Sequence, residues 1–212
     1  MHAATNHDDW LYPITRFTFG VPGRLAWGLK LVGRDFCPPD GPLLVAANHA
    51  SYLDPFYLTG RLPRPIRWLV NETWFHKSPR WRSFFEAHGC LAVSKGEPEE
   101  TLDRILGTLA AGEAVGIFPE GRLSPDGRPG RVRAGLGWMA ARSGAPVLPC
   151  GIQGSFEVLP KGHAWPRTGR VTIRLGAPMR YPDGPVAAPD PRDAARFSGE
   201  VMGRIRELFE TR

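Results

Sequence analysis

The residues best suited to chemistry in this chain are His49 and Asp54, in a segment at 48–55 that reads NHASYLDP. The segment follows a short apolar run at 42–47, which predicts a buried strand, and α/β proteins bind ligands beyond the carboxyl ends of such strands. We expect Asp54 to hydrogen-bond one imidazole nitrogen of His49 and leave the other free as a general base near neutral pH. The alternative is that the two residues only cap a turn and a helix.

A second polar segment, at 118–127, reads FPEGRLSPDG and follows another apolar run. Here Gly121 would let a ligand approach the backbone closely, and Arg122 would offer its planar donors to an anion. Three more arginines follow closely, namely Arg128, Arg131 and Arg133. The alternative for this segment is a solvated polar loop.

Two further segments carry weaker signals. At 89–96, Lys95 stands next to a glycine just after a predicted strand, where a lysine is either an anion-binding group or simply solvated. At 145–154, a run rich in proline and glycine would either line the wall of an acyl-chain site or form ordinary core.

Other chemistries find little support. The chain has no Gly-x-Ser-x-Gly nucleophile motif, and its six histidines lack the spacing of a zinc site. Its three cysteines, Cys37, Cys90 and Cys150, are far apart and are predicted to be small buried core residues. We therefore expect neither a metal nor a disulfide framework.

Strand and helix patterns alternate along the chain. Strands are predicted at 42–47, 66–70, 90–93, 114–118, 146–149 and 171–175, and helices at 80–88, 98–111, 134–142 and 191–210, with another opening at Asp54. This alternation predicts a single α/β domain with a mixed, largely parallel sheet covered by helices.

The N-terminal part of the chain differs from the rest. Residues 10–32 mix aromatic and cationic side chains without an acid, and Pro22 with Gly23 is predicted to break them into two short helical pieces. Such a segment either lies in a membrane interface or packs on the core of its own domain. We therefore divide the chain into an N-terminal amphipathic, interfacial segment at 1–35 and a main domain at 36–212.

Composition limits the class of protein. The 212 residues carry 27 Lys and Arg against 21 Asp and Glu, a formal charge of +6, and 42% of them are hydrophobic. These values are typical of a folded globular chain and exclude a disordered one. With no membrane-spanning run, no secretory leader and no nucleic-acid-binding motif, we expect an intracellular protein, soluble or at a membrane surface, that binds no nucleic acid.

Taken together and in this order, the four segments resemble the conserved blocks of the glycerolipid acyltransferases. The segment at 48–55 resembles the family's Asn-His-x4-Asp block, and the one at 118–124 its Phe-Pro-Glu-Gly-Thr-Arg-Ser block. The segments at 89–95 and 146–154 resemble the other two blocks. The resemblance covers roughly residues 40–160 and implies a fold of the glycerol-3-phosphate acyltransferase type.

The resemblance implies that the chain moves a fatty acyl group from acyl-CoA or acyl carrier protein to the hydroxyl of a lysophospholipid, 1-acylglycerol-3-phosphate first of all. His49 and Asp54 would be catalytic, while Lys95, Glu120, Gly121 and Arg122 would bind the acceptor. No cofactor would be needed beyond the acyl donor. The enzyme would serve phospholipid biosynthesis as a peripheral protein on the cytoplasmic face of the cell membrane.

The chain departs from the family pattern at two positions that concern the acceptor phosphate. Arg122-Leu123 replaces the usual Thr-Arg, and Lys95 stands where arginine is usual, which keeps the charge but loses the two-pronged donor. A lyso-ornithine lipid or a glycolipid is therefore an alternative acceptor. A non-catalytic lipid-binding relative and a thioester hydrolase are the remaining alternatives.

Overall fold

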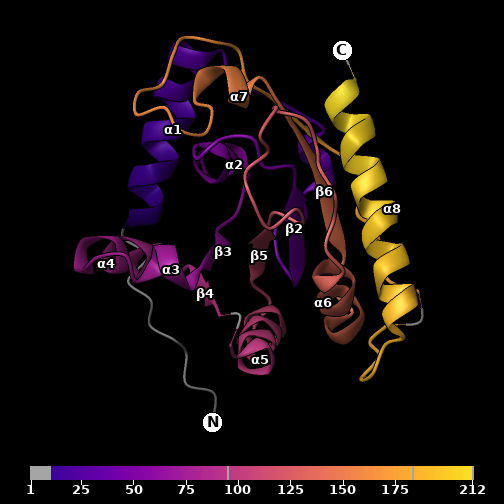
Figure 1. The fold of residues 1–212 in the computed structure, drawn as a ribbon. Helices are drawn as coiled ribbons and strands as arrows, with labels where there is room; N and C mark the ends of the chain where they lie inside the picture. The colour runs from indigo at the N-terminus through magenta and orange to yellow at the C-terminus, as the bar shows by residue number, and fades with distance from the viewer. Residues whose placement is uncertain (1–10, 95, 183, 212) are drawn as a thin grey trace.

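One sheet of seven strands forms the centre of the computed structural model, which describes residues 11–94, 96–182 and 184–211 (Figure 1). Across the sheet the strands lie in the order β1-β7-β6-β2-β5-β3-β4. Neighbours are parallel except for β6 and β7, which pair antiparallel. The strands are β1 (Lys30–Val32), β2 (Leu43–Ala47), β3 (Ile66–Asn71), β4 (Leu91–Val93), β5 (Ala114–Ile117), β6 (Val147–Gln153) and β7 (Thr172–Leu175).

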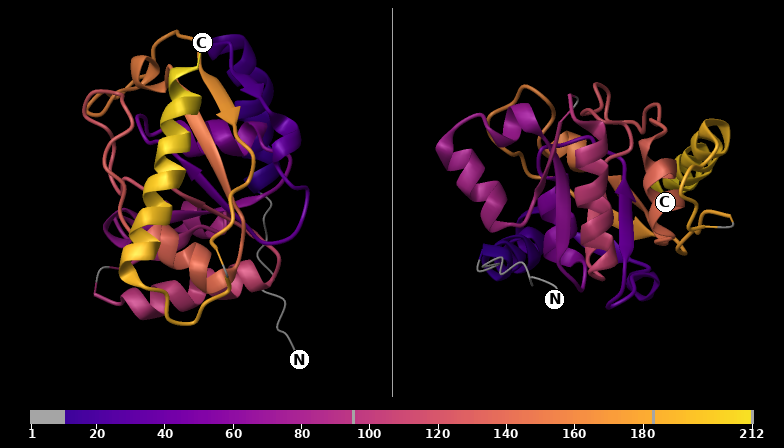
Figure 2. Two further views of the ribbon diagram at one scale, coloured as in Figure 1. Left: turned by 90° about the vertical axis from the view of Figure 1, so that its right-hand side faces the viewer. Right: turned by 90° about the horizontal axis from the view of Figure 1, so that it is seen from below.

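Helices cover both faces of this sheet. On one face α8 lies along β6 beside α6 and α5, as Figure 2 shows, and on the other α1 packs against α2. The helices are α1 (Leu11–Trp27), α2 (Asp54–Arg61), α3 (Glu72–Phe75), α4 (Pro79–Ala87), α5 (Pro98–Ala110), α6 (Gly135–Ser143), α7 (Ser155–Val158) and α8 (Pro191–Glu210), with a short 3₁₀ turn, η1, at Arg34–Phe36.

The central strand β2 supplies side chains to two hydrophobic cores. Leu43, Val45 and Ala47 point into the core beneath α1 and α2, whereas Leu44 and Ala46 point into the core beneath α5, α6 and α8. All five residues are fully buried. A strand buried on both faces reads as a continuous apolar run, which is why its position was predictable and why the loop that follows it is firmly anchored.

The predicted α/β fold with a mixed, largely parallel sheet is confirmed. Each predicted strand and helix of the main domain is present, with bounds shifted by a few residues at most. The sequence did not indicate β1, η1, α3 or α7. These elements are only three or four residues long, too short to show a periodic pattern.

The prediction of two helical pieces in the N-terminal segment is wrong. Residues 11–27 form the single helix α1, which continues through Pro22, and the strand β1 follows it. An internal proline costs a helix about 3 kcal/mol, so tertiary packing must hold α1 together. That packing includes Gly20, whose backbone lies so close to α2 that an added Cβ would stand 3.2 Å from the Gly60 carbonyl oxygen.

The two faces of α1 have different surroundings. Its inner face is buried against the domain, with Phe19 stacked on Phe56 of α2 at 5.0 Å between ring centroids. Its outer face exposes the apolar side chains Ile14, Phe17, Val21 and Leu25, by 52%, 70%, 54% and 84%. Within the described residues, no helix has both the length and the hydropathy to cross a membrane. The first ten residues of the proposed 1–35 segment lie outside the described residues.

Candidate active site

Asn48 directly follows the central strand β2, and its side chain extends the hydrogen bonding of the sheet. Its Nδ2 donates to the carbonyl oxygen of Ile152 at 2.9 Å, and its Oδ1 accepts from the Ile152 amide at 2.7 Å. The amide thus pairs with β6 as a backbone peptide would, in a fully buried position. These bonds fix the point at which the chain leaves the sheet, one residue before His49.

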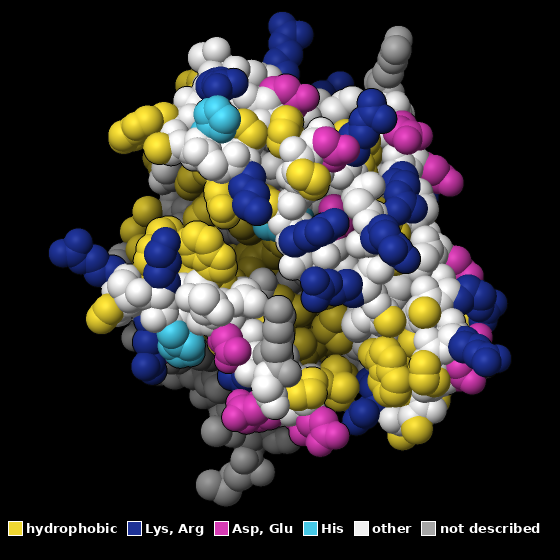
Figure 3. Space-filling view, viewed as in Figure 1, with side chains coloured by type: hydrophobic (Ala, Val, Ile, Leu, Met, Phe, Trp, Pro, Cys, Tyr) yellow, Lys and Arg dark blue, Asp and Glu magenta, His cyan; other side chains and the backbone are white. Residues whose placement is uncertain are grey.

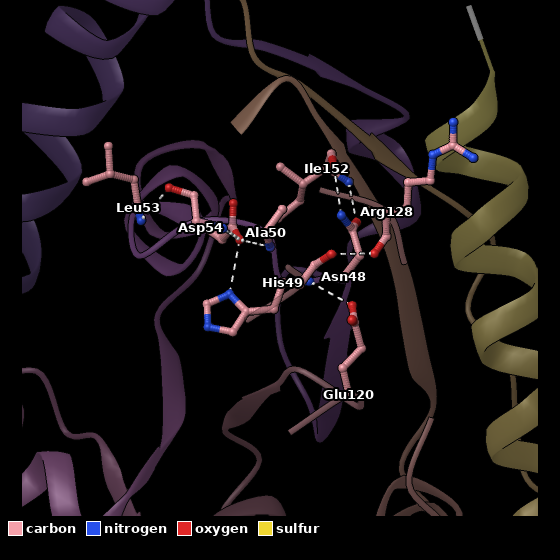
Figure 4. A network of polar contacts seen from close by, with 10 residues as sticks. Asn48, His49, Ala50, Leu53, Asp54, Glu120, Arg128 and Ile152 are labelled. Carbon is pink, nitrogen blue, oxygen red and sulfur yellow. Dashed lines mark hydrogen bonds and ion pairs between the residues drawn. The ribbon is translucent and has the colours of Figure 1, made fainter. Parts of the chain in front are cut away.

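The expected bond between His49 and Asp54 is present (Figure 4). Asp54 is the fully buried first residue of α2, and its Oδ2 lies 3.0 Å from Nδ1 of His49. The same oxygen accepts from the amides of Ala50 and Ser51 at 2.7 and 2.8 Å. Because a carboxylate only accepts hydrogen bonds, Nδ1 carries a proton, and in the neutral imidazole the free lone pair is then on Nε2.

Aromatic rings fix the orientation of the imidazole. The His49 ring stacks on Phe118 with centroids 3.8 Å apart and planes 13° from parallel, and Phe118 stacks in turn on Trp68 at 5.1 Å. The His49 side chain is 18% exposed, and its Nε2 edge points away from Asp54 in Figure 4. The ring is therefore held on one face and one edge, with the basic nitrogen on the free edge.

The loop after β5 holds the main chain of His49 from both sides. Glu120 Oε1 accepts from the His49 amide at 3.0 Å, and the Ser124 amide donates to the His49 carbonyl oxygen at 2.7 Å. The second oxygen of Glu120 accepts from the Gly130 amide at 3.0 Å. Burial raises the pKa of Glu120 above its usual range, and these two backbone donors partly oppose the shift.

This placement bears on the acceptor-binding role expected for Glu120. Its side chain is only 4% exposed, and each carboxylate oxygen already faces a backbone donor. In this structure Glu120 supports the loop at 48–54 that carries His49, the histidine loop, and its carboxylate is directed at the amides of His49 and Gly130.

The remaining predicted acceptor-binding residues lie apart from that network. Gly121 adopts a left-handed conformation, and an added Cβ would stand 2.9 Å from Nε of Arg133, so the two pack closely. Arg122 is exposed beside it, and Arg128 points away from His49 in Figure 4. Lys95 lies outside the described residues. Figure 3 shows a hollow in this face of the molecule, with a hydrophobic floor and Lys and Arg side chains along its rim.

The sequence alone did not predict a role for two residues of the site, Asn48 and Phe118. Asn48 and Phe118 both lie in segments singled out for their chemistry, yet their types alone did not distinguish a ligand contact from support. Their position in the sequence could have identified them as site residues, since each immediately follows the last residue of a buried strand. A residue there borders the site while its side chain can still reach the neighbouring strands.

The cysteine thiols and the potential metal ligands among the described residues bear on two other kinds of catalysis. Burial raises the pKa of Cys90 to about 12 and that of Cys150 well above its usual value, which opposes thiolate formation. In the described part of the chain, no three His, Cys, Asp or Glu side chains gather as metal ligands would. The His49–Asp54 contact gives the site acid–base chemistry from one histidine supported by one carboxylate.

Comparison with known proteins agrees with this geometry. The profile of the acyltransferase family matches residues 28–153. A 1-acyl-sn-glycerol-3-phosphate acyltransferase of Chlamydomonas reinhardtii is 32% identical over 188 residues, 85% of this chain and 56% of that protein. The enzyme of the same name from Bacillus subtilis is 25% identical over 187 residues, 87% of this chain and 89% of its own.

Among solved structures, the 1-acyl-sn-glycerophosphate acyltransferase PlsC of Thermotoga maritima shares the fold, with a TM-score of 0.75 and 23% identity. The match covers all of this chain and 85% of that one. The chain spans little more than half the length of its algal relative. The family match itself covers more than half of this chain, including the histidine loop and the loop after β5, and so this chain belongs to the acyltransferase family.

Proposed function

We propose that this protein transfers a fatty acyl group from an acyl thioester, carried on coenzyme A or acyl carrier protein, to the free hydroxyl of 1-acylglycerol-3-phosphate. The observation that carries the proposal is the His49–Asp54 pair, with Nδ1 held by the carboxylate and Nε2 free. The names of the relatives support the same reaction and acceptor.

In the proposed reaction, Nε2 of His49 removes the proton from the acceptor hydroxyl while its oxygen attacks the thioester carbonyl carbon. The resulting tetrahedral intermediate collapses as the carbon–sulfur bond breaks, and the imidazolium returns its proton to the departing thiolate. Asp54 stabilises the imidazolium between these two steps. Orientation of both substrates supplies much of the remaining acceleration.

The acceptor head group would bind at the exposed loop after β5. We assign the phosphate to Arg122, with Lys95 and the backbone of Gly121 as further contacts. Arg122 has no ion pair or side-chain hydrogen bond within the described residues, so its guanidinium can bind a phosphate without breaking an existing contact. Glu120 acts in this proposal as a positioning residue. The hydrophobic floor of the hollow in Figure 3 would hold an acyl chain.

The membrane surface is the expected source of the acceptor. The outer face of α1, defined by Ile14, Phe17, Val21 and Leu25, is an exposed apolar stripe at helical spacing. A helix of this kind inserts shallowly into a lipid interface, which would make the enzyme a peripheral membrane protein. The cytoplasmic face of the membrane is the side that we assign to it.

The test compares the purified wild type with His49→Ala and with His163→Ala, a matched control at an exposed histidine. Acyl-CoA and acyl carrier protein serve as donors, with lysophosphatidate, a lyso-ornithine lipid and a lyso-glycolipid as acceptors. We expect wild type and His163→Ala to acylate lysophosphatidate, and His49→Ala to lose at least a thousandfold in turnover while its melting temperature stays near that of the wild type.

Other results would redirect the proposal. Retained turnover in folded His49→Ala would refute the role of the histidine. Transfer only to a lipid without phosphate would remove the phosphate assignment, as would an Arg122→Ala variant with an unchanged KM for lysophosphatidate. Thioester cleavage without acceptor, equally fast in its presence, would identify a hydrolase.

A further inference from the structure

A second group of cations lies between α1, α2 and β1. Arg24, Lys30 and Arg61 line a cavity of about 360 Å³ together with Gly28, Leu29 and Leu31. No acidic residue lines it. Within the described residues, these three cations have no ion pair and no side-chain hydrogen bond, unlike Arg67 of β3, which pairs with Glu113 just before the neighbouring strand β5.

Close helix packing builds this cavity. Gly60 of α2 meets the backbone of α1 so closely that an added Cβ would stand 2.8 Å from the Phe19 carbonyl carbon. This contact places the next residue, Arg61, beside α1 and near Arg24. After α1 the chain turns at Gly28, which has a φ of 49°, and returns as β1 with Lys30 at its start. Three separate elements therefore direct one cation each to the same place.

The charges of Arg24, Lys30 and Arg61 favour the binding of an anion. Nε of Arg61 is buried without a hydrogen-bond partner among the described residues. Burial lowers the pKa of Arg61 below its usual range, and repulsion from Arg24 and Arg34 adds to the shift. An unpaired donor among mutually repelling charges is unfavourable, and a bound anion removes both penalties.

We propose that this cavity binds a phosphate, namely that of an anionic phospholipid head group in the membrane on which the protein docks. The planar donors of Arg24 and Arg61 match phosphate oxygens, and Lys30 adds a point charge. Leu25, the most exposed apolar residue of the outer face of α1, follows Arg24 directly. A lipid bound here would thus meet a phosphate site and an apolar face side by side. The proposal rests on the membrane docking proposed above.

This lipid would be distinct from the acceptor. Asp54 is the first residue of α2 and Arg61 is the last, so the two are separated by the length of the helix, about 10 Å at 1.5 Å per residue. A phosphate in the cavity would therefore orient the enzyme on the membrane without entering the reaction.

The experiment measures binding to vesicles of phosphatidylcholine, with or without 30% phosphatidylglycerol, by cosedimentation. It compares wild type, Arg61→Gln, Arg61→Lys and the control Arg192→Gln, which removes an exposed charge from α8 on the other side of the sheet. We expect the wild type to prefer anionic vesicles, and Arg61→Gln to lose about fivefold of that preference. We also expect Arg61→Lys to lose most of this preference, because lysine lacks the planar paired donors of arginine. The control Arg192→Gln should retain the preference.

Four results would overturn the proposal. Equal binding of the wild type to both kinds of vesicle would show that no anionic lipid is recognised. If Arg192→Gln lost as much of the preference for anionic vesicles as Arg61→Gln, the preference would be assigned to diffuse charge. Full retention of the preference in Arg61→Lys would lead to the same assignment. Inorganic phosphate that raises the melting temperature of wild type but not of Arg61→Gln, together with no Arg61-dependent preference for anionic vesicles, would reassign the cavity to free phosphate. Acyl transfer to monomeric lysophosphatidate without vesicles is measured in parallel. Transfer without an Arg61-dependent preference defeats this inference alone, and the preference without transfer defeats the proposed reaction alone.

Discussion

Replacing Asp54 with asparagine separates the charge of this residue from its hydrogen bonds. All three donors, the His49 ring and the amides of Ala50 and Ser51, reach the same oxygen, Oδ2. An asparagine with its amide oxygen in that place keeps all three bonds. The flipped orientation would set its NH2 group against two backbone N–H groups. The first orientation therefore prevails, and Nδ1 of His49 keeps its proton.

The expected loss of rate follows from the missing charge. The imidazolium that forms in the transition state would face a neutral amide across the 3.0 Å contact. With charge centres roughly 4 Å apart and an effective dielectric constant of about 20, the lost attraction is about 4 kcal/mol. At about 1.4 kcal/mol per tenfold change, turnover should fall about a thousandfold, with little change in KM.

The assay pairs kinetics with a readout of the tautomer. Steady-state kcat and KM with acyl-CoA and lysophosphatidate give the rate effect. Nitrogen chemical shifts of the His49 ring, assigned by comparison with His49→Ala, show which nitrogen carries the proton. Thermal unfolding confirms that Asp54→Asn is folded at the assay temperature.

Two outcomes would refute this reasoning. A loss of less than tenfold would mean that the charge of Asp54 contributes little to the transition state. A large loss accompanied by a proton on Nε2 would assign the effect to a reversed tautomer, and the argument from three donors on one oxygen would be wrong.

Two other substitutions test the support around His49. Asn48→Ala removes two buried hydrogen bonds and leaves the amide and carbonyl of Ile152 unpaired, so stability in chemical denaturation should fall by roughly 1–3 kcal/mol for each group; a loss below 1 kcal/mol in total would contradict this. Glu120→Gln tests the raised pKa of Glu120, since the folded protein binds that proton more tightly than the unfolded chain. The folding stability that protonated Glu120 contributes is fully present below the ordinary pKa near 4.5. It is lost as pH rises through the higher pKa of Glu120 in the folded protein. The advantage of wild type over Glu120→Gln in denaturation midpoints should therefore shrink as pH rises through that window, and a widening advantage would show the opposite sign.

Much of the fold followed from the sequence because parallel strands are buried on both faces. The runs at 43–47 and 114–118 are apolar throughout, and each is flanked by polar or turn residues. The spacing of His49 and Asp54 likewise predicted their contact, because a tight turn between a strand and a helix leaves few other partners within reach.

The rest depended on long-range contacts that no local pattern reveals. Helix α1 continues through Pro22 because of its packing against α2, which lies more than thirty residues further along the chain. The same applies to Glu120, since its residue type fits a ligand contact as well as a support. Only the fold shows that the amides of His49 and Gly130 occupy its two oxygens.

The attachment of His49 to the loop after β5 also sets where the chain can change in length. Within seven residues, that loop supplies the ring of Phe118, the carboxylate of Glu120 and the amide of Ser124, all directed at one histidine. A one-residue insertion between Phe118 and Ser124 would misalign these contacts together. An insertion at the turn after α5, near Gly112, would leave them untouched. Grafting the histidine loop into another α/β scaffold would therefore require both loops in their native lengths, together with Trp68 stacked on Phe118.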